Sequence, residues 1–263
     1  MALKFTIQGA LIYATLAFFI ATFIAALLSR KASVFSRVFW FGGFLAALAS
    51  LVWRAIASGH APMQNLFEFF LCMAAVLWPL SFFAKRRSGI DTTVTDAILG
   101  VLILFPAGFV FDEGIRLLPP ALQSPLFVPH VGSYIAAYVL LARATFLALP
   151  LWSAELPENE RVRRDAAVRE MVAVGFCFLT AGLLLGSVWG QYCWGHFWAW
   201  DPKEMASLAT WFVYAAYFHV RLRNGLSHPR LSVLLLVTGI VFILFTLTWI
   251  NISRLFSGMH TYA

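Results

Sequence analysis

The stretch WGQYCWGHFWAWDPKE, residues 189–204, gathers four tryptophans and two other aromatic residues in sixteen positions. Indole rings offer large, rigid, apolar faces with one polar N–H at the edge. Trp194 and Trp198 are four residues apart, and Trp200 and Asp201 follow closely. We therefore expect a short surface helix that groups part of this aromatic surface on one side.

Histidines are the second group of side chains with evident chemistry. Imidazole is a common axial ligand of haem iron. His130 and His260 come from different segments, so they could hold a planar macrocycle between them against the tryptophan surface. His196 lies inside the stretch itself and could compete as a ligand, whereas His228 is most simply a solvated loop residue.

Such a site needs structural elements to carry it, and the composition indicates which. The chain is 61% hydrophobic and only 12% charged, which is typical of an integral membrane protein. A helix needs about 20 apolar residues to cross about 30 Å of hydrocarbon. Eight stretches come close to this length: 7–28, 36–56, 64–84, 94–111, 130–151, 170–188, 204–221 and 231–250. We expect an all-α protein with about eight transmembrane helices, forming one domain over residues 1–263.

The distribution of positive charge predicts how these helices are oriented across the membrane. Thirteen of the 19 Lys and Arg residues fall on one side of the predicted spans, and cytoplasmic loops carry such an excess. Both termini should then face outward, and the tryptophan-rich stretch should be an outer loop or short helix between the sixth and seventh spans. The net charge of +7 is explained by topology and needs no nucleic-acid partner.

The alternative explanation for the tryptophans is the aromatic belt that many membrane proteins carry at the interface. A belt accounts for Trp189 and Tyr192 but poorly for the density of the whole stretch. A planar ligand with carboxylate groups would also find cations on the outer side. These are Arg54, Arg116, Lys203 and Arg254.

Few strongly polar side chains occur within the predicted spans, where each is costly and therefore a functional candidate. Gln64 and Glu68 are four residues apart, as on one helical face, and Arg143 and His219 lie deeper. The sequence leaves open whether these four residues serve structure or function. His219 has a second interpretation as an interfacial residue close to cytoplasmic headgroups.

Two other features limit the interpretation. The polar residues 153–170 predict a cytoplasmic connection with a short surface helix after Pro157. Cys72, Cys177 and Cys193 form no C-x-x-C pair, and there is no C-x-x-C-H segment. The chain is therefore not itself a c-type cytochrome.

Five ordered segments resemble a known family. The tryptophan-rich stretch resembles the WWD motif of the haem-handling membrane proteins of cytochrome c biogenesis, and its WDPKE ending is more similar to the CcsA/ResC type of system II than to the CcmC type of system I. The other four similar segments are GHAPMQNLFEFF (59–70), PHVGSYIAAYVLL (129–141), TWFVYAAYFHVR (210–221) and GMHTYA (258–263).

The resemblance implies that the chain binds b-type haem non-covalently on the outer face and presents it to apocytochrome c. There, the cysteine thiols of a C-x-x-C-H segment add to the haem vinyl groups. It further implies that His130 and His260 are the axial ligands of this outer haem. The platform beneath the haem would consist of Trp194, Trp198, Trp200 and Asp201.

The same resemblance implies partners and a location. His219 would receive an inner haem together with a histidine from a CcsB/ResB-type membrane subunit. Thiol-reducing proteins would act indirectly, by keeping the apocytochrome cysteines reduced. The expected location is the bacterial inner membrane or the thylakoid membrane.

Other functions stay open at this point. The chain could be a haem transporter, or a relative linked to haem biosynthesis without ligation activity; a transporter would favour paired helices broken by Gly or Pro, which are not evident. A b-type electron-transfer subunit would need histidine pairs stacked through the bilayer, and only His219 lies at depth.

Overall fold

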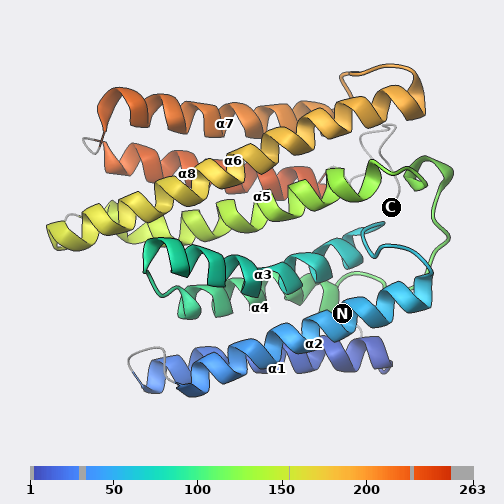
Figure 1. Cartoon of the computed structure of the whole chain (residues 1–263), viewed down its shortest axis with the longest axis horizontal. Coiled ribbons are helices and arrows are strands. Elements are labelled where there is room, and N and C mark those ends of the chain that lie inside the picture. Colours follow the sequence, from blue (N-terminus) through green and yellow to red (C-terminus); the bar gives the residue numbers. More distant parts are fainter. Residues whose placement is uncertain (1–2, 30–33, 154, 226–227, 250–263) are drawn as a thin grey trace. The chain divides into compact units, whose positions relative to one another are not determined.

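The computed structural model describes residues 3–29, 34–153, 155–225 and 228–249. Regular structure in these residues is helical, with eight α-helices and a few short helical turns (Figure 1). This confirms the all-α prediction. The chain divides into two compact units, Met1–Leu122 (unit 1) and Gln123–Ala263 (unit 2).

Unit 1 contains the first four helices. They are α1 (Ile7–Leu28), α2 (Val34–Ser58), α3 (Leu66–Ser88) and α4 (Thr93–Phe109). Both α1 and α3 pack against α2 and α4. Local signals set the ends of α3: Asn65 caps its start by accepting from the backbone N–H of Glu68, and Gly89 ends it at a φ of 67°. These signals define the turn that leads into α4.

Unit 2 contains the other four helices. They are α5 (Phe127–Ala148), α6 (Glu158–Trp194), α7 (Pro202–Asn224) and α8 (Pro229–Leu244). A 3-10 turn, η2 (Leu149–Trp152), extends α5, and a π-helical turn, η3 (Phe245–Trp249), extends α8. Both α5 and α7 pack against α6 and α8. Figure 1 shows α6 as the long helix beside α5.

The helix α6 is longer than the sequence analysis predicts. The sequence predicts a separate short helix after Pro157, but the structure has one helix of 37 residues from Glu158 into the apolar span. Acidic side chains in its first turn favour the positive end of the helix dipole. Glu160 and Arg164 pair at 2.7 Å one turn apart. The polar segment therefore continues the helix and does not separate it from the span.

Six helices in the described ranges are long and apolar enough to cross a membrane, which makes the chain a multi-pass membrane protein. They are α1, α2, α3, α5 with η2, α6, and α8 with part of η3. The apolar α4 is shorter, at 17 residues. Charged residues occur in the first and last turns of α7. Eight spans in one domain, with both termini outward, stay predictions.

Candidate functional site: the tryptophan segment and its histidine

The tryptophan-rich stretch connects α6 to α7. Trp194 is the last residue of α6, and Gly195, at a φ of 80°, ends the helix with its N–H bonded to the Gln191 carbonyl. Residues 195–201, which with Trp194 we call the tryptophan segment, are not helical. The prediction of a short helix that groups Trp194 with Trp198 is therefore wrong. The left-handed glycine interrupts the helical path between them.

Asp201 has a clear structural role at the start of α7. Its carboxylate accepts from the backbone N–H of Lys203 at 2.8 Å. The carboxylate of Glu204 accepts from the backbone N–H groups of Asp201 and Ala199, at 3.2 and 2.9 Å. With Pro202 in the first turn, this is a capping box. The D-P-x-E spacing signals this helix start in the sequence, independently of any role for Asp201 beside a haem.

Trp200 is held in an unusual conformation next to this cap. Its φ is 58°, the one positive value for a residue other than glycine in the described chain, and its side chain is 67% exposed. A left-handed conformation costs a bulky residue about 1–3 kcal/mol and persists only when its surroundings enforce it. The Glu204 carboxylate provides that enforcement, because it accepts from the backbone N–H groups on both sides of Trp200, those of Ala199 and Asp201, and the Trp200 indole is left exposed.

In contrast to the exposed Trp200, Trp198 has a buried indole nitrogen. Its ring lies edge-on to Trp200, with centroids 6.1 Å apart and planes at 84°. The indole Nε1 of Trp198 is buried and has no hydrogen-bond partner among the residues that the structure describes. A buried donor without an acceptor costs about 1–3 kcal/mol. The tryptophan segment thus combines the exposed ring of Trp200 with the unpaired indole N–H of the neighbouring Trp198.

His130 lies in the first turn of α5 and faces α6. Its Nδ1 is 2.9 Å from the carbonyl oxygen of Gly182. The imidazole centroid is 5.5 Å from that of Trp189, and Trp189 in turn lies 5.4 Å from Trp194. The structure therefore connects two predicted site residues, His130 and Trp194, through Trp189.

This role for Trp189 corrects the sequence analysis, which assigned it to an aromatic belt. Trp189 is only 3% exposed, so it is a core residue between His130 and Trp194 and does not face a membrane interface. Tyr192, assigned to the same belt, is 78% exposed. The burial of Trp189 depends on how α5 packs on α6. The spacing of the tryptophans in the sequence does not predict that packing.

The remaining predicted histidines lie elsewhere. His260 falls outside the described residues. His219 is exposed on α7, 18 residues after Asp201 and about 27 Å along the helix axis. It therefore lies apart from the tryptophan segment. His196 is exposed, and its Nδ1 donates to the carbonyl of Trp194 at 2.8 Å, a bond within its own loop.

Lys203 adds a cation at the start of α7, before the apolar stretch 204–221. Removal from water lowers the pKa of its ammonium group to about 8, and the Asp201 carboxylate opposes that decrease. Near neutral pH this lysine carries a positive charge, but it loses the charge at a lower pH than an ordinary lysine.

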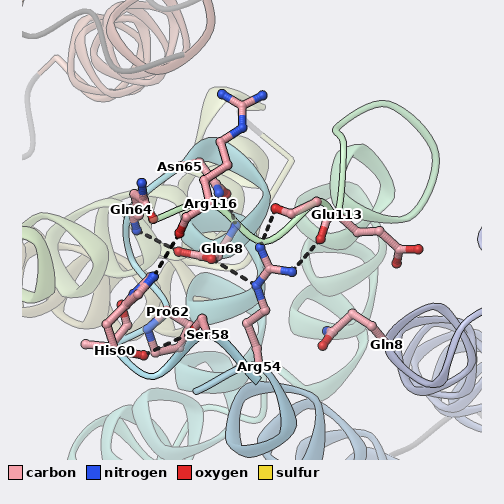
Figure 2. A network of polar contacts seen from close by, with 12 residues as sticks. Gln8, Arg54, Ser58, His60, Pro62, Gln64, Asn65, Glu68, Glu113 and Arg116 are labelled. Atoms are coloured by element: carbon pink, nitrogen blue, oxygen red, sulfur yellow. Dashed lines mark hydrogen bonds and ion pairs between the residues drawn. The ribbon is translucent and has the colours of Figure 1, made fainter. Parts of the chain in front are cut away.

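A second group of polar residues lies in unit 1 (Figure 2). This polar cluster consists of Arg54, His60, Gln64, Asn65, Glu68 and Glu113. Arg54 and Glu68 are 2% and 1% exposed, and their side chains pair at 2.9 Å. The other two nitrogens of the Arg54 guanidinium donate to the backbone carbonyls of Glu113 and Gly114, at 2.5 and 3.0 Å. Arg54 is thus committed within the cluster and is not an exposed cation for a ligand.

The rest of the polar cluster is also directed at backbone groups. Gln64 precedes α3, so the predicted helical pair of Gln64 and Glu68 is wrong in detail; the Gln64 N–H donates instead to the Glu68 carboxylate at 2.8 Å. The Gln64 amide donates to the carbonyl of Leu117 at 2.9 Å. His60 has Nδ1 at 2.9 Å from the carbonyl of Ala61. The cluster fastens residues 113–117 to the ends of α2 and α3.

The tryptophan segment and His130 fit a planar macrocycle with carboxylate groups, such as haem, better than the polar cluster does. Trp200 and Phe197 expose aromatic surface, at 67% and 58%. The Trp198 indole N–H would gain an acceptor. A histidine whose Nδ1 bonds a carbonyl can offer Nε2 to a metal.

Comparison with known proteins identifies the family of this chain. The sequence matches the cytochrome C assembly protein family over residues 3–257. It is 31% identical to the cytochrome c biogenesis protein CcsA of Prochlorococcus marinus, over 83% of this chain and 80% of the relative. It is 25% identical to the protein of the same name from Daucus carota, over 83% of each chain.

One solved structure, of the cytochrome c haem lyase CcmF, has a similar fold. The TM-score is 0.72 at 19% sequence identity, and the match covers 94% of this chain. It covers 47% of the other chain, so this protein spans about half the length of that lyase. At this identity the likeness concerns the fold.

Proposed function

Since the chain belongs to the cytochrome c assembly protein family, and is of the CcsA type, we propose that it holds haem at the tryptophan segment and presents it for covalent attachment to apocytochrome c. Family membership gives the chain a role in cytochrome c maturation. The proposal adds the site, the ligand and the step.

The observation that carries the proposal is the connection of His130 to Trp194 through the buried Trp189. It puts a metal-binding side chain against the beginning of an exposed aromatic segment. Flat aromatic surface, an unsatisfied indole donor and a nearby cation at Lys203 complement the faces and carboxylates of a porphyrin.

In this proposal His130 and His260 are the axial ligands of the haem. Trp198 donates its N–H to a haem carboxylate, and Lys203 offers a charge to the same groups. Trp194 and Trp200 provide apolar contact. Asp201 acts indirectly, because its capping box holds Trp200 in place.

The covalent step is the addition of a cysteine thiol of the apocytochrome across a haem vinyl group. A carbon–sulfur bond forms, the vinyl double bond becomes single, and the thiol proton ends on the other vinyl carbon, so no oxidant is consumed. The thiolate is the nucleophile and belongs to the substrate. The contribution of this chain is to hold the haem in a geometry that the thiols can reach.

The proposed arrangement in the membrane follows the charge distribution. Positive loops face the cytoplasm, and the tryptophan segment faces the outer side of the inner or thylakoid membrane. His219, exposed on α7, takes haem from the inner side with a histidine of a CcsB/ResB-type subunit. Thiol-reducing proteins act on the apocytochrome.

A reconstituted maturation assay tests the proposal. The chain is co-expressed with a CcsB-type partner and a reporter apocytochrome in a host that lacks its own maturation system, and covalent haem is detected by staining. We expect haem in the purified complex and stained reporter, and loss of both when His130 and His260 are replaced by alanine. Absence of haem, or an unchanged spectrum and unchanged maturation in the double variant, would overturn it. Transport of haem into vesicles without any ligation would favour the transporter alternative.

A further inference from the structure

The His130 ring approaches α6 more closely than any side chain at the facing position would permit. A Cβ atom built on Gly186 would lie 2.5 Å from Cε1 and 2.9 Å from Nδ1 of His130. Contacts below 3.0 Å between carbon and a ring require one group to move. Only glycine at position 186 is compatible with the observed place of the ring.

The same approach explains how the ring reaches the backbone. In an α-helix the carbonyl of residue 182 points along the axis toward residue 186. A side chain at 186 would stand beside that carbonyl, and its absence opens the path along which His130 Nδ1 comes to 2.9 Å from the Gly182 oxygen.

This bond determines which ring nitrogen carries the proton. A carbonyl oxygen can only accept, so Nδ1 must be the donor. In the neutral imidazole the lone pair then resides on Nε2, which is the nitrogen that can bind a metal. A hydrogen bond from the opposite ring nitrogen also fixes the orientation of a metal-binding histidine and raises its basicity.

We propose that Gly182 and Gly186 form a seat in α6 that sets the tautomer and position of His130 for iron binding through Nε2. Both glycines are positioning residues, Gly182 through its carbonyl and Gly186 through the space it leaves. The inference rests on the proposed function, because it concerns the histidine that holds haem there.

The seat distinguishes His130 from another histidine of the described chain. His60 has Nδ1 at 2.9 Å from the Ala61 carbonyl, within its own turn, and its Nε2 lies 3.5 Å from the Arg116 carbonyl. Its two ring nitrogens both face acceptors, an arrangement that suits a structural histidine. His130 instead bonds a carbonyl of a different helix.

The first test needs no variant and no haem. Nitrogen NMR of the imidazoles in the purified haem-free protein, with His130 assigned by comparison with His130→Ala, reports which ring nitrogen is protonated. We expect the Nδ1–H form at neutral pH. An Nε2–H form would overturn the seat whatever the haem content of the protein.

The second test compares two glycine replacements on the same helix face. Gly186→Ala should displace His130, change its NMR signals, and weaken haem retention about tenfold, as loss of an outer-shell partner does. The reduction potential of the retained haem should rise, because the iron loses a more basic ligand. The matched control is Gly175→Ala, where a Cβ would lie 2.9 Å from Leu141 and so strains the same α5–α6 contact away from His130.

The outcomes separate the inference from the proposed function. If Gly175→Ala and Gly186→Ala affect haem retention and potential equally, the effect is packing and the seat is wrong. If Gly186→Ala leaves the His130 signals unchanged, the seat is also wrong. If the unmodified protein and His130→Ala bind haem equally, the proposed function fails at this histidine while the NMR measurement still decides the tautomer.

Discussion

In unit 1, Arg54 directs its guanidinium at a buried carboxylate and two backbone carbonyls, whereas in unit 2 the Trp198 indole N–H is buried with no partner in the described part of the chain. The polar cluster of unit 1 pairs its buried charges, Arg54 and Glu68, and ties a loop to two helices, although the amide oxygen of Gln64 is buried without a hydrogen-bond partner among the described residues. The tryptophan segment of unit 2 exposes aromatic faces and holds Trp200 in a strained conformation. The difference teaches that charge density alone is a poor guide to a ligand site, and that exposed aromatic surface held in a strained conformation is a better one.

The largest expected effect comes from opening the polar cluster. Glu68→Ala leaves the buried Arg54 without its carboxylate, and we expect this to lower the free energy of unfolding by about 3–5 kcal/mol. Thermal unfolding in detergent, followed by the fraction of monodisperse protein, measures the loss. Replacing both partners, Arg54→Met with Glu68→Leu, should recover much of the stability. An unchanged unfolding temperature in Glu68→Ala would contradict a structural role for the cluster.

The second prediction concerns the unsatisfied donor in unit 2. Trp198→Phe keeps an aromatic ring but removes the N–H, and we expect haem affinity to fall about tenfold, the loss of one hydrogen bond to a charged group. Haem titration by absorbance measures it. Trp211→Phe is the matched control, since the Trp211 N–H already donates to the Thr180 hydroxyl at 3.0 Å. That control should lower stability without lowering haem affinity; equal losses of affinity in both variants would remove the contrast.

The smallest expected effect is the pH dependence of binding. Because the pKa of Lys203 is lowered to about 8, its positive charge disappears as pH rises through that value. Its attraction for haem carboxylates then weakens, and we expect affinity to fall a few-fold between about pH 7 and pH 9. Lys203→Arg, which keeps its charge over this range, should bind equally at both pH values. A pH-independent affinity in the unmodified protein would exclude Lys203 from the site.

Much of the fold could be predicted because hydrocarbon imposes a length and a composition on each helix. The apolar stretch 7–28 coincides with α1, and each of the other predicted spans overlaps one α-helix over most of its length. Apolar character does not predict the long polar start of α6, which is supported instead by paired charges such as Glu160 and Arg164. Polar helical turns can be recognised in a sequence from opposite charges spaced three or four residues apart.

The site was predictable in residue type but not in arrangement. The sequence singled out His130, Trp194 and Trp198, yet one left-handed glycine, Gly195, places the two tryptophans on different local structures. The contact of His130 with Gly182 depends on how closely two helices approach, a distance that is set by packing and has no signal in either local sequence. Asp201 could have been recognised as a helix cap from the spacing of Asp and Glu alone.

The unbroken course of α6 has a mechanical consequence. At 37 residues it measures about 55 Å, well beyond the thickness of the hydrocarbon. Asp165, near its polar end, is paired with Arg221 of α7 at 2.5 Å, and Gly182 and Gly186 contact His130 further along. Because the helix is continuous, Asp165 of the Asp165–Arg221 pair and the glycines that contact His130 belong to one rigid element, and a change of tilt at the polar turns would also move the imidazole.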